Sequence, residues 1–246
     1  MVVSHSPQEK QVLEIRELGA AVNGVRQVSD RRLYCQFLAF GNCYQRNLLV
    51  EALRKSSLEV VLYEDLNDAR GVGLLVLSED PNFFVGSLRQ FLLKEPFISL
   101  VPKPELTMFG RTYSLGRETD LEEWLLRRPR RNALNPQWPW AVWYPLRRKQ
   151  EFALLTQEEQ GKILMEHAMI GMAYGEAGYA HDIRLACFGL DKNDNEFVIG
   201  LVGPDLYPLS KIVQDMRKTE QTAKYIQSLG PFFVGKVCWQ SPFTRP

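Results

Sequence analysis

The stretch from Thr156 to Tyr174 contains the residue best suited to hold a metal ion. Thr156 and Glu159 form a capping-box signature, and apolar residues recur after it with helical spacing. Ile163, His167 and Tyr174 therefore share one face of a helix. An imidazole in an apolar stripe needs partners for its ring nitrogens, and a neutral histidine in such a pocket suits iron or zinc. The alternative is a core histidine whose nitrogens are satisfied by hydrogen bonds.

The composition of the chain argues against several classes of partner. A chain of 246 residues can bury a substantial core, as one large domain or two smaller ones. The formal net charge of +1 gives no reason to expect nucleic acid as a general partner. The sequence has no run of about 18 apolar residues, so we expect no membrane span. The N-terminal MVVSHSPQEK lacks the charged and apolar segments of a secretory signal.

The cysteines show neither a metal-binding nor a disulfide pattern. None of them belongs to a CxxC pair, and three lie in apolar runs, where cysteine behaves as a small buried hydrophobe. We therefore expect no zinc site and no disulfide framework, and we expect the protein in the cytoplasm. The cysteines are Cys35, Cys43, Cys187 and Cys238.

Two successive α+β units are expected from the order of predicted elements. The first half reads as strand 33–41, a helix from Leu49, a strand at Val60, strand 71–80, a helix after Pro81 and strand 105–114. The second half reads as strand 140–148, helix 156–174, hairpin 182–203, helix 208–230 and strand 232–238. This rhythm predicts an α+β fold of two ferredoxin-like domains, of the dimeric α/β-barrel type. The expected domains are 1–120 and 140–246, joined by an arginine- and proline-rich connector at 121–139.

Three blocks of the second half resemble a known family. They are YPLRRK at 144–149, LMEHAMIGMAY at 164–174 and MRKTEQTAKYIQSLGPFFVG at 216–235. Together they are similar to the chlorite dismutase superfamily of haem proteins and, within it, to the coproheme decarboxylases. The resemblance covers about the last hundred residues. It implies a pair of ferredoxin-like domains, often assembled as a homopentamer.

The resemblance also implies a haem chemistry and two central residues. His167 matches the proximal haem ligand, and Tyr144 matches the tyrosine that becomes the oxidising radical in the decarboxylases. The implied reaction belongs to haem biosynthesis and converts iron coproporphyrin, which is both substrate and cofactor, to haem b. Hydrogen peroxide is the implied co-substrate, and the protein's task is to place the phenol beside the porphyrin.

Four further residues match positions that bind the propionates of the porphyrin, namely Arg130, Arg148, Arg217 and Thr222. Coproheme carries four propionates, so its pocket needs hydrogen-bond donors and positive charge. Each charge-assisted bond from an arginine contributes about 1.5–3 kcal/mol. The alternative is that these arginines are solvated charges. We expect most of the basic run at 127–131 to be a solvated face and only Arg130 to enter the pocket.

The residue on the other side of the haem stays open at this point. Counting along the family pattern places Asp182 there, but this chain is longer before Gly189, and Arg184 shares a strand face with Asp182. A slip of one residue would turn His181 and Ile183 inward instead. Because chlorite dismutases carry an arginine at this position, Arg184 would favour a chlorite-decomposing enzyme. A third hypothesis is a haem carrier or sensor without turnover.

Overall fold

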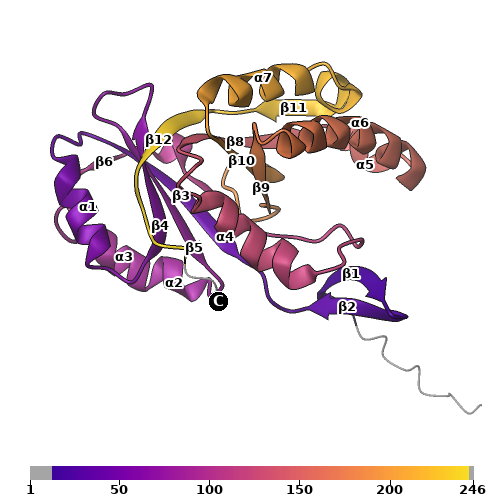
Figure 1. The fold of residues 1–246 in the computed structure, drawn as a ribbon, viewed down its shortest axis with the longest axis horizontal. Coiled ribbons are helices and arrows are strands. Elements are labelled where there is room, and N and C mark those ends of the chain that lie inside the picture. The colour runs from indigo at the N-terminus through magenta and orange to yellow at the C-terminus, as the bar shows by residue number, and fades with distance from the viewer. Residues whose placement is uncertain (1–12, 244–246) are drawn as a thin grey trace, which may run out of the picture.

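Eight strands close into a barrel in the computed structural model, which describes residues 13–243 (Figure 1). The strands pair in the order β10-β9-β7-β3-β5-β4-β12-β8, and pairing between β8 and β10 closes the ring. The segment 1–10, in which we expect no secretory signal, lies outside the described residues. The barrel strands are β3 (Tyr34–Gly41), β4 (Glu59–Asp65), β5 (Val72–Ser78), β7 (Met108–Arg111), β8 (Trp140–Arg148), β9 (His181–Ala186), β10 (Phe197–Gly203) and β12 (Phe233–Gln240).

The interior of the barrel is filled by side chains from all eight strands. Successive strand residues point to opposite faces, so every second residue of each strand enters this core. Four aromatic rings, those of Phe37, Tyr63, Trp143 and Phe233, pack against one another at its centre. The two halves of the chain therefore share one hydrophobic core.

Helices cover the outside of the barrel on two sides. In the first half, the elements follow the order β3-α1-β4-β5-α2-α3-β7, and the outer face of β4 and β5 packs against the helices. In the second half, α6 and α7 lie side by side, with α7 over β8 and β10 and α6 next to β9 (Figure 1). The helices are α1 (Arg46–Arg54), α2 (Asn82–Val85), α3 (Ser87–Leu92), α4 (Arg128–Ala133), α5 (Gln150–Leu154), α6 (Gln157–Glu176) and α7 (Leu206–Met216).

Short elements link the main ones. A hairpin of β1 and β2 precedes the barrel, and the connector is helical rather than irregular, because η3 continues into α4. Within residues 13–243, no helix combines the length and apolar character needed to cross a bilayer. The short elements are β1 (Glu17–Val22), β2 (Val25–Ser29), η1 (Phe97–Ser99), β6 (Val101–Pro102), η2 (Pro104–Leu106), η3 (Glu123–Arg127), η4 (Gln221–Tyr225) and β11 (Ile226–Leu229).

The predicted helix 208–230 is wrong in its second part. Helix α7 ends at Met216, and a π-helical turn, η4, leads into strand β11. Strand β12 pairs with β8 only as far as Trp143, which leaves the end of β8 without a partner on that side. The segment before Gly230 fills this edge and pairs with Leu146 to Arg148. Backbone pairing with β8 therefore overrides the helical pattern of the sequence.

A methyl group added at Gly200 should destabilise the protein, because it would collide with a side chain inside the barrel. A Cβ atom built there would lie 2.5 Å from the ring of Trp143. Gly200→Ala should lower the free energy of unfolding by about 1–3 kcal/mol, measured by urea denaturation. The control is Gly161→Ala on α6, where an added Cβ meets no side chain and should raise stability by about 0.5–1 kcal/mol. Equal effects of the two substitutions would contradict the close packing at Gly200.

Candidate haem site

Strand β8 supplies the phenol of the candidate site. Trp143 points into the barrel, so Tyr144 points to the face covered by α6 and α7. Tyr144 is only 6% exposed, and its ring stacks on Phe232 at a centroid distance of 4.7 Å. Burial and then the negative charge of Asp182 raise the pKa of Tyr144, although the cation of Arg217 opposes this. The phenol is therefore protonated at neutral pH.

A row of side chains crosses the sheet at the level of Tyr144. The register of β8, β10 and β9 aligns Tyr144 with Ile199 and Ile199 with Arg184. Because residues directly opposite in antiparallel strands share a face, Arg184 lies on the same face as Tyr144. Asp182, two residues earlier on β9, lies on this face as well and forms an ion pair with Arg184 at 2.7 Å.

His181 and Ile183, the other two residues of β9 that the sequence left open, lie outside this face. Ile183 is buried in the barrel interior. His181 stacks on Trp138 with a centroid distance of 3.6 Å and an angle of 13°. Of the alternatives left open by the sequence, Asp182 and Arg184 therefore face the site, and His181 does not.

Helix α6 carries His167 over this sheet face. The predicted capping box is confirmed: the backbone N–H of Glu159 donates to the Thr156 hydroxyl at 3.3 Å, and the Glu159 carboxylate accepts from the Thr156 N–H at 2.8 Å. The predicted apolar stripe is also confirmed, because Ile163 is buried and Tyr174 packs on the cluster under α6 and α7. His167 is half-buried within that stripe.

The contacts of His167 fix which ring nitrogen is available. Its Nδ1 lies 3.5 Å from Oγ1 of Thr219, a residue that is 1% exposed. The Thr219 hydroxyl donates its hydrogen to the Met216 carbonyl at 2.8 Å. Its oxygen can therefore only accept from His167, which assigns the proton to Nδ1 and leaves the lone pair on Nε2. This arrangement suits a histidine that binds a metal ion through Nε2.

The charge state of His167 agrees with this assignment. Burial, followed by the nearby cation of Arg184, lowers the pKa of His167 below its ordinary value of 6.5. The imidazole is therefore neutral at pH 7 and able to bind a metal ion.

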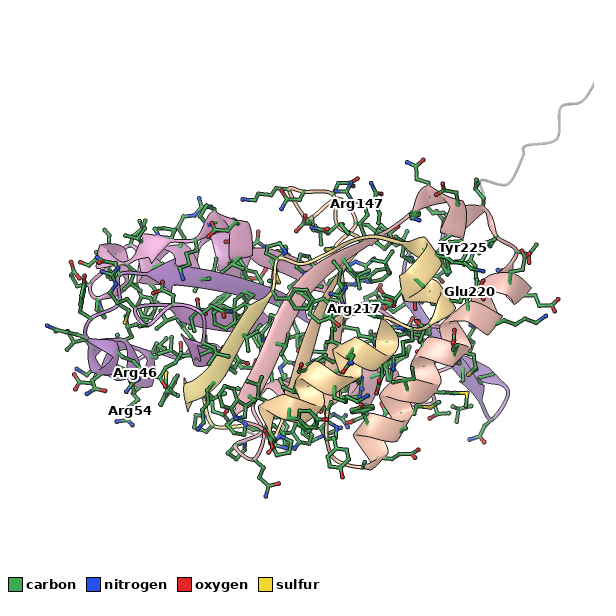
Figure 2. The ribbon with its side chains drawn as sticks, turned by 90° about the horizontal axis from the view of Figure 1, so that it is seen from above. Arg46, Arg54, Arg147, Arg217, Glu220 and Tyr225 are labelled. Carbon is green, nitrogen blue, oxygen red and sulfur yellow. The ribbon has the colours of Figure 1, made fainter. Side chains whose placement is uncertain are left out.

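Arg217 and Thr222 approach the site from the end of α7. Arg217 is the residue that follows the helix (Figure 2). Its positive charge acts on Tyr144. Among residues 13–243, no carboxylate forms an ion pair with Arg217. Thr222 lies in η4, where its Oγ1 is 3.3 Å from that of Thr219, which in turn contacts His167. The sequence pattern did not single out Thr219.

Arg148 lies on the same strand face as Tyr144 but has partners within the protein. Its guanidinium lies over the rings of Phe152 and Phe197, at 4.6 and 4.8 Å from their centroids. It also forms an ion pair with Glu196 at 2.8 Å. The structure thus holds Arg148 at the rim of the face, already paired with a carboxylate.

Arg130 is the predicted residue that the structure does not bring to this face. Its guanidinium binds Glu59 at 2.9 Å and Glu79 at 3.3 Å, two carboxylates of the first half of the chain. The connector arginine that reaches the site is instead Arg128, which forms an ion pair with Asp182. The sequence predicts a solvated Arg128, whereas the structure pairs it with Asp182. One helical turn holds both residues, so spacing alone did not distinguish them.

Cavities in the structure differ greatly in size and position. A cavity of about 10 Å³, enough for one water molecule, lies beside Arg184 and is lined by Tyr113 and Trp124. A wider cleft of about 810 Å³ opens elsewhere, between the start of α1 and Trp140. The side chains on the face around Tyr144, and not a large cavity, are therefore the reason to treat this face as the candidate site. A histidine with a free Nε2, convergent arginines and a hydroxyl suit a carboxylated metalloporphyrin.

Removing the cation of Arg184 should change the titration of His167. In the protein without haem, Arg184→Met should raise the pKa of His167, followed by NMR of the ring C–H signals. His181 is an internal reference, because burial and Arg128, not Arg184, lower its pKa. With its pKa lowered by folding, His167 binds a proton less readily than in the unfolded chain. Its contribution to stability should therefore fall as the pH drops below 6.5. A His167 pKa that stays fixed in the variant would contradict the proximity of Arg184.

Known proteins share part of this sequence and most of this fold. A coproheme decarboxylase from Oceanobacillus iheyensis is 36% identical over 104 residues, which is 41% of this chain and 40% of that protein. The match thus spans less than half of that relative. A haem-binding protein from Thermus thermophilus superposes with a TM-score of 0.69 at 19% identity, covering 84% of this chain and 91% of the other.

A second solved structure confirms the mixed α/β fold. An arginine-to-alanine variant of chlorite dismutase from Candidatus Nitrospira defluvii superposes with a TM-score of 0.65 at 15% identity. The match covers 87% of this chain and 93% of the other, and at such identity it shows the fold alone. The family model described as chlorite dismutase matches residues 112–238, more than half of the chain. The chain belongs to the chlorite dismutase family.

Proposed function

We propose that this protein is a haem enzyme that converts iron coproporphyrin to haem b with hydrogen peroxide. The carrying observation is the buried phenol of Tyr144, which lies on the sheet face that α6 covers with His167. The relative from Oceanobacillus iheyensis, named coproheme decarboxylase, supports this choice of substrate. Iron coproporphyrin would be both substrate and cofactor, as the sequence blocks imply.

The residues of the site divide into three roles. His167 would hold the iron through Nε2, with Thr219 orienting the ring from behind. Arg217, which has no carboxylate partner in residues 13–243, and Thr222 would bind propionates. Arg148 would exchange part of its contact with Glu196 for a propionate. Charge-assisted bonds of this kind contribute about 1.5–3 kcal/mol each.

Tyr144 would carry the oxidation to the substrate. Bound iron and peroxide supply an oxidant strong enough to take an electron from a phenol. Because its pKa is raised, Tyr144 keeps its proton on Oη and would give up an electron and a proton together, both to the bound oxidant. The oxidised Tyr144 would then take a hydrogen atom from a propionate carbon and be restored. Loss of one further electron to the oxidant and of carbon dioxide would leave a vinyl group, and the second propionate would repeat the sequence.

One observation favours a second function. Arg184 lies on the site face, in the row that contains Tyr144, and a chlorite-decomposing enzyme would use a cation there. Sustained release of oxygen from chlorite would support that function. Binding of haem without product from either oxidant would instead support a carrier or sensor.

The order of strands supports two domains, and the cysteines support a cellular compartment for the protein. We infer that 1–120 and 140–246 are ferredoxin-like units joined by the connector 121–139. The pairing orders β7-β3-β5-β4 and β9-β10-β8-β12 support this, since each is the order of a βαββαβ unit. We also infer a cytoplasmic location, which the four free cysteines support.

We further infer a homo-oligomer, of which a pentamer is the form that the family resemblance implies. Helix α6 is apolar on its outer side as well as on the side that faces the sheet. Such a stripe is characteristic of an interface. Its exposed apolar residues are Leu164, Met165, Met169 and Met172.

Tyr144→Phe should block the formation of haem b while coproheme still binds. The substitution removes only the hydroxyl, so the packing against Phe232 remains. Purified protein loaded with ferric coproheme is treated with peroxide, and the products are separated by chromatography. The matched control is Tyr179→Phe, which removes an exposed hydroxyl after the end of α6 and should retain turnover. Undiminished turnover in Tyr144→Phe would refute the proposed role.

Met169→Glu should dissociate the oligomer. Met169 is 60% exposed in the single chain, and a carboxylate at the centre of an apolar interface would be desolvated without a partner. Light scattering coupled to size exclusion measures the mass. The control is Val85→Glu on α2, an equally exposed apolar residue in the other half. An unchanged mass in Met169→Glu would exclude this stripe as the interface.

A further inference from the structure

Asp182 lies between two arginines on the site face. Its Oδ2 is 2.7 Å from Nε of Arg184, and its Oδ1 binds Nη2 of Arg128 from the connector. Burial opposes ionisation of Asp182, but the cations of Arg184 and Arg128 outweigh it and lower the pKa of the carboxyl. The cluster therefore contains one anion and two cations.

The ring of Trp124, in the connector, packs against the guanidinium groups of both Arg128 and Arg184. The ring centroid lies 4.8 Å from the guanidinium carbon of Arg128 and 5.1 Å from that of Arg184. Cation–π contacts of this kind restrict the position of a long side chain. The indole is itself fixed, because its Nε1–H donates to the Tyr113 carbonyl at 2.9 Å. The connector thus reaches the site of the second half.

This arrangement leaves the outer end of Arg184 free. The ion pair with Asp182 involves Nε of Arg184, and neither terminal nitrogen of Arg184 donates a hydrogen bond to any of residues 13–243. The small cavity beside Arg184 is lined by Tyr113 and Trp124. Two terminal nitrogens supply four N–H donors in a fixed plane, which match the paired oxygens of a small oxyanion.

We propose that Asp182 is a positioning residue which, with Trp124, holds Arg184 so that its terminal nitrogens bind a small oxyanion in the site. The inference rests on the proposed function, because the oxyanion would lie in the proposed haem site, between Arg184 and the haem that His167 would hold. Asp182 would not touch the oxyanion itself. Its contribution is the fixed orientation of the guanidinium, which removes the entropy cost of ordering a free arginine upon binding.

Asp182→Asn separates this role from simple electrostatics, because the two give opposite results. Removal of one negative charge makes the face more positive, so electrostatics alone predicts tighter binding of an anion. Loss of the charged tether frees Arg184, so positioning predicts weaker binding. Formate serves as the oxyanion probe, and imidazole serves as a neutral probe that needs no cation.

The test uses the protein loaded with ferric haem b and titrations followed by absorption. Asp182→Asn and Trp124→Leu should each weaken formate binding by about tenfold, the scale of one charge-assisted hydrogen bond, with imidazole affinity unchanged. Glu123→Gln is the matched control, because it converts a connector carboxylate paired with Arg131 and should leave both affinities unchanged. Equal or tighter binding of formate in Asp182→Asn would overturn the proposal.

A second measurement needs no haem and separates this proposal from the proposed function. In the unloaded protein, ¹⁵N NMR relaxation should show an Nε–H signal with the order of a rigid side chain, assigned to Arg184 by its absence in Arg184→Lys. The order of that signal should fall in Asp182→Asn, because the ion pair that holds the guanidinium is lost. A signal that stays equally ordered would refute the tether even if haem binds. Failure of the wild type to take up haem, with the tether intact, would instead refute the proposed function alone.

Discussion

Alternation of side chains along β8 is the constraint on which the site depends. The strand belongs to a closed barrel, so its side chains divide between a sealed interior and an outer face covered by helices. Trp143 fills the interior, and its neighbour Tyr144 is thereby turned toward α6. A shift of β8 by one residue would exchange these two rings and place the phenol in the dry core. Core packing thus specifies the position of the Tyr144 phenol.

Charge on the site face is controlled by elements far apart in the sequence. Arg184 and Asp182 come from β9, whereas Arg128 and Trp124 come from the connector between the halves. A carboxylate held between two arginines on an aromatic shelf loses water contacts but keeps strong partners, which makes the geometry of the cluster specific. The connector is therefore part of the site as well as a link between the halves.

The sequence allowed the prediction of elements whose signals are local. The capping box at Thr156, the apolar stripe with His167 and the strand 140–148 depend on short-range patterns, and the structure contains all three. The helix predicted through residue 230 failed because a strand edge of β8, remote in sequence, captures that segment as β11. Arg130 and Arg128 could not be told apart for a similar reason. Their partners, Glu59 on β4 and Asp182 on β9, lie more than fifty residues away in opposite directions.

The partner of His167 bears on the chemistry that the site can support. Thr219 offers a neutral oxygen, at a long 3.5 Å, where a carboxylate would pull strongly on the Nδ1 proton. A carboxylate partner makes an imidazole more basic and stabilises higher oxidation states of a bound metal. With a hydroxyl partner, and with burial and Arg184 both disfavouring positive charge on the ring, His167 would be a weakly basic ligand in the proposed function. A weakly basic ligand would leave a bound iron more electron-poor, which would strengthen its pull on an electron from Tyr144. In the proposed reaction, the hydroxyl of Thr219 and the cation of Arg184 would therefore act in the same direction, toward oxidation of the phenol.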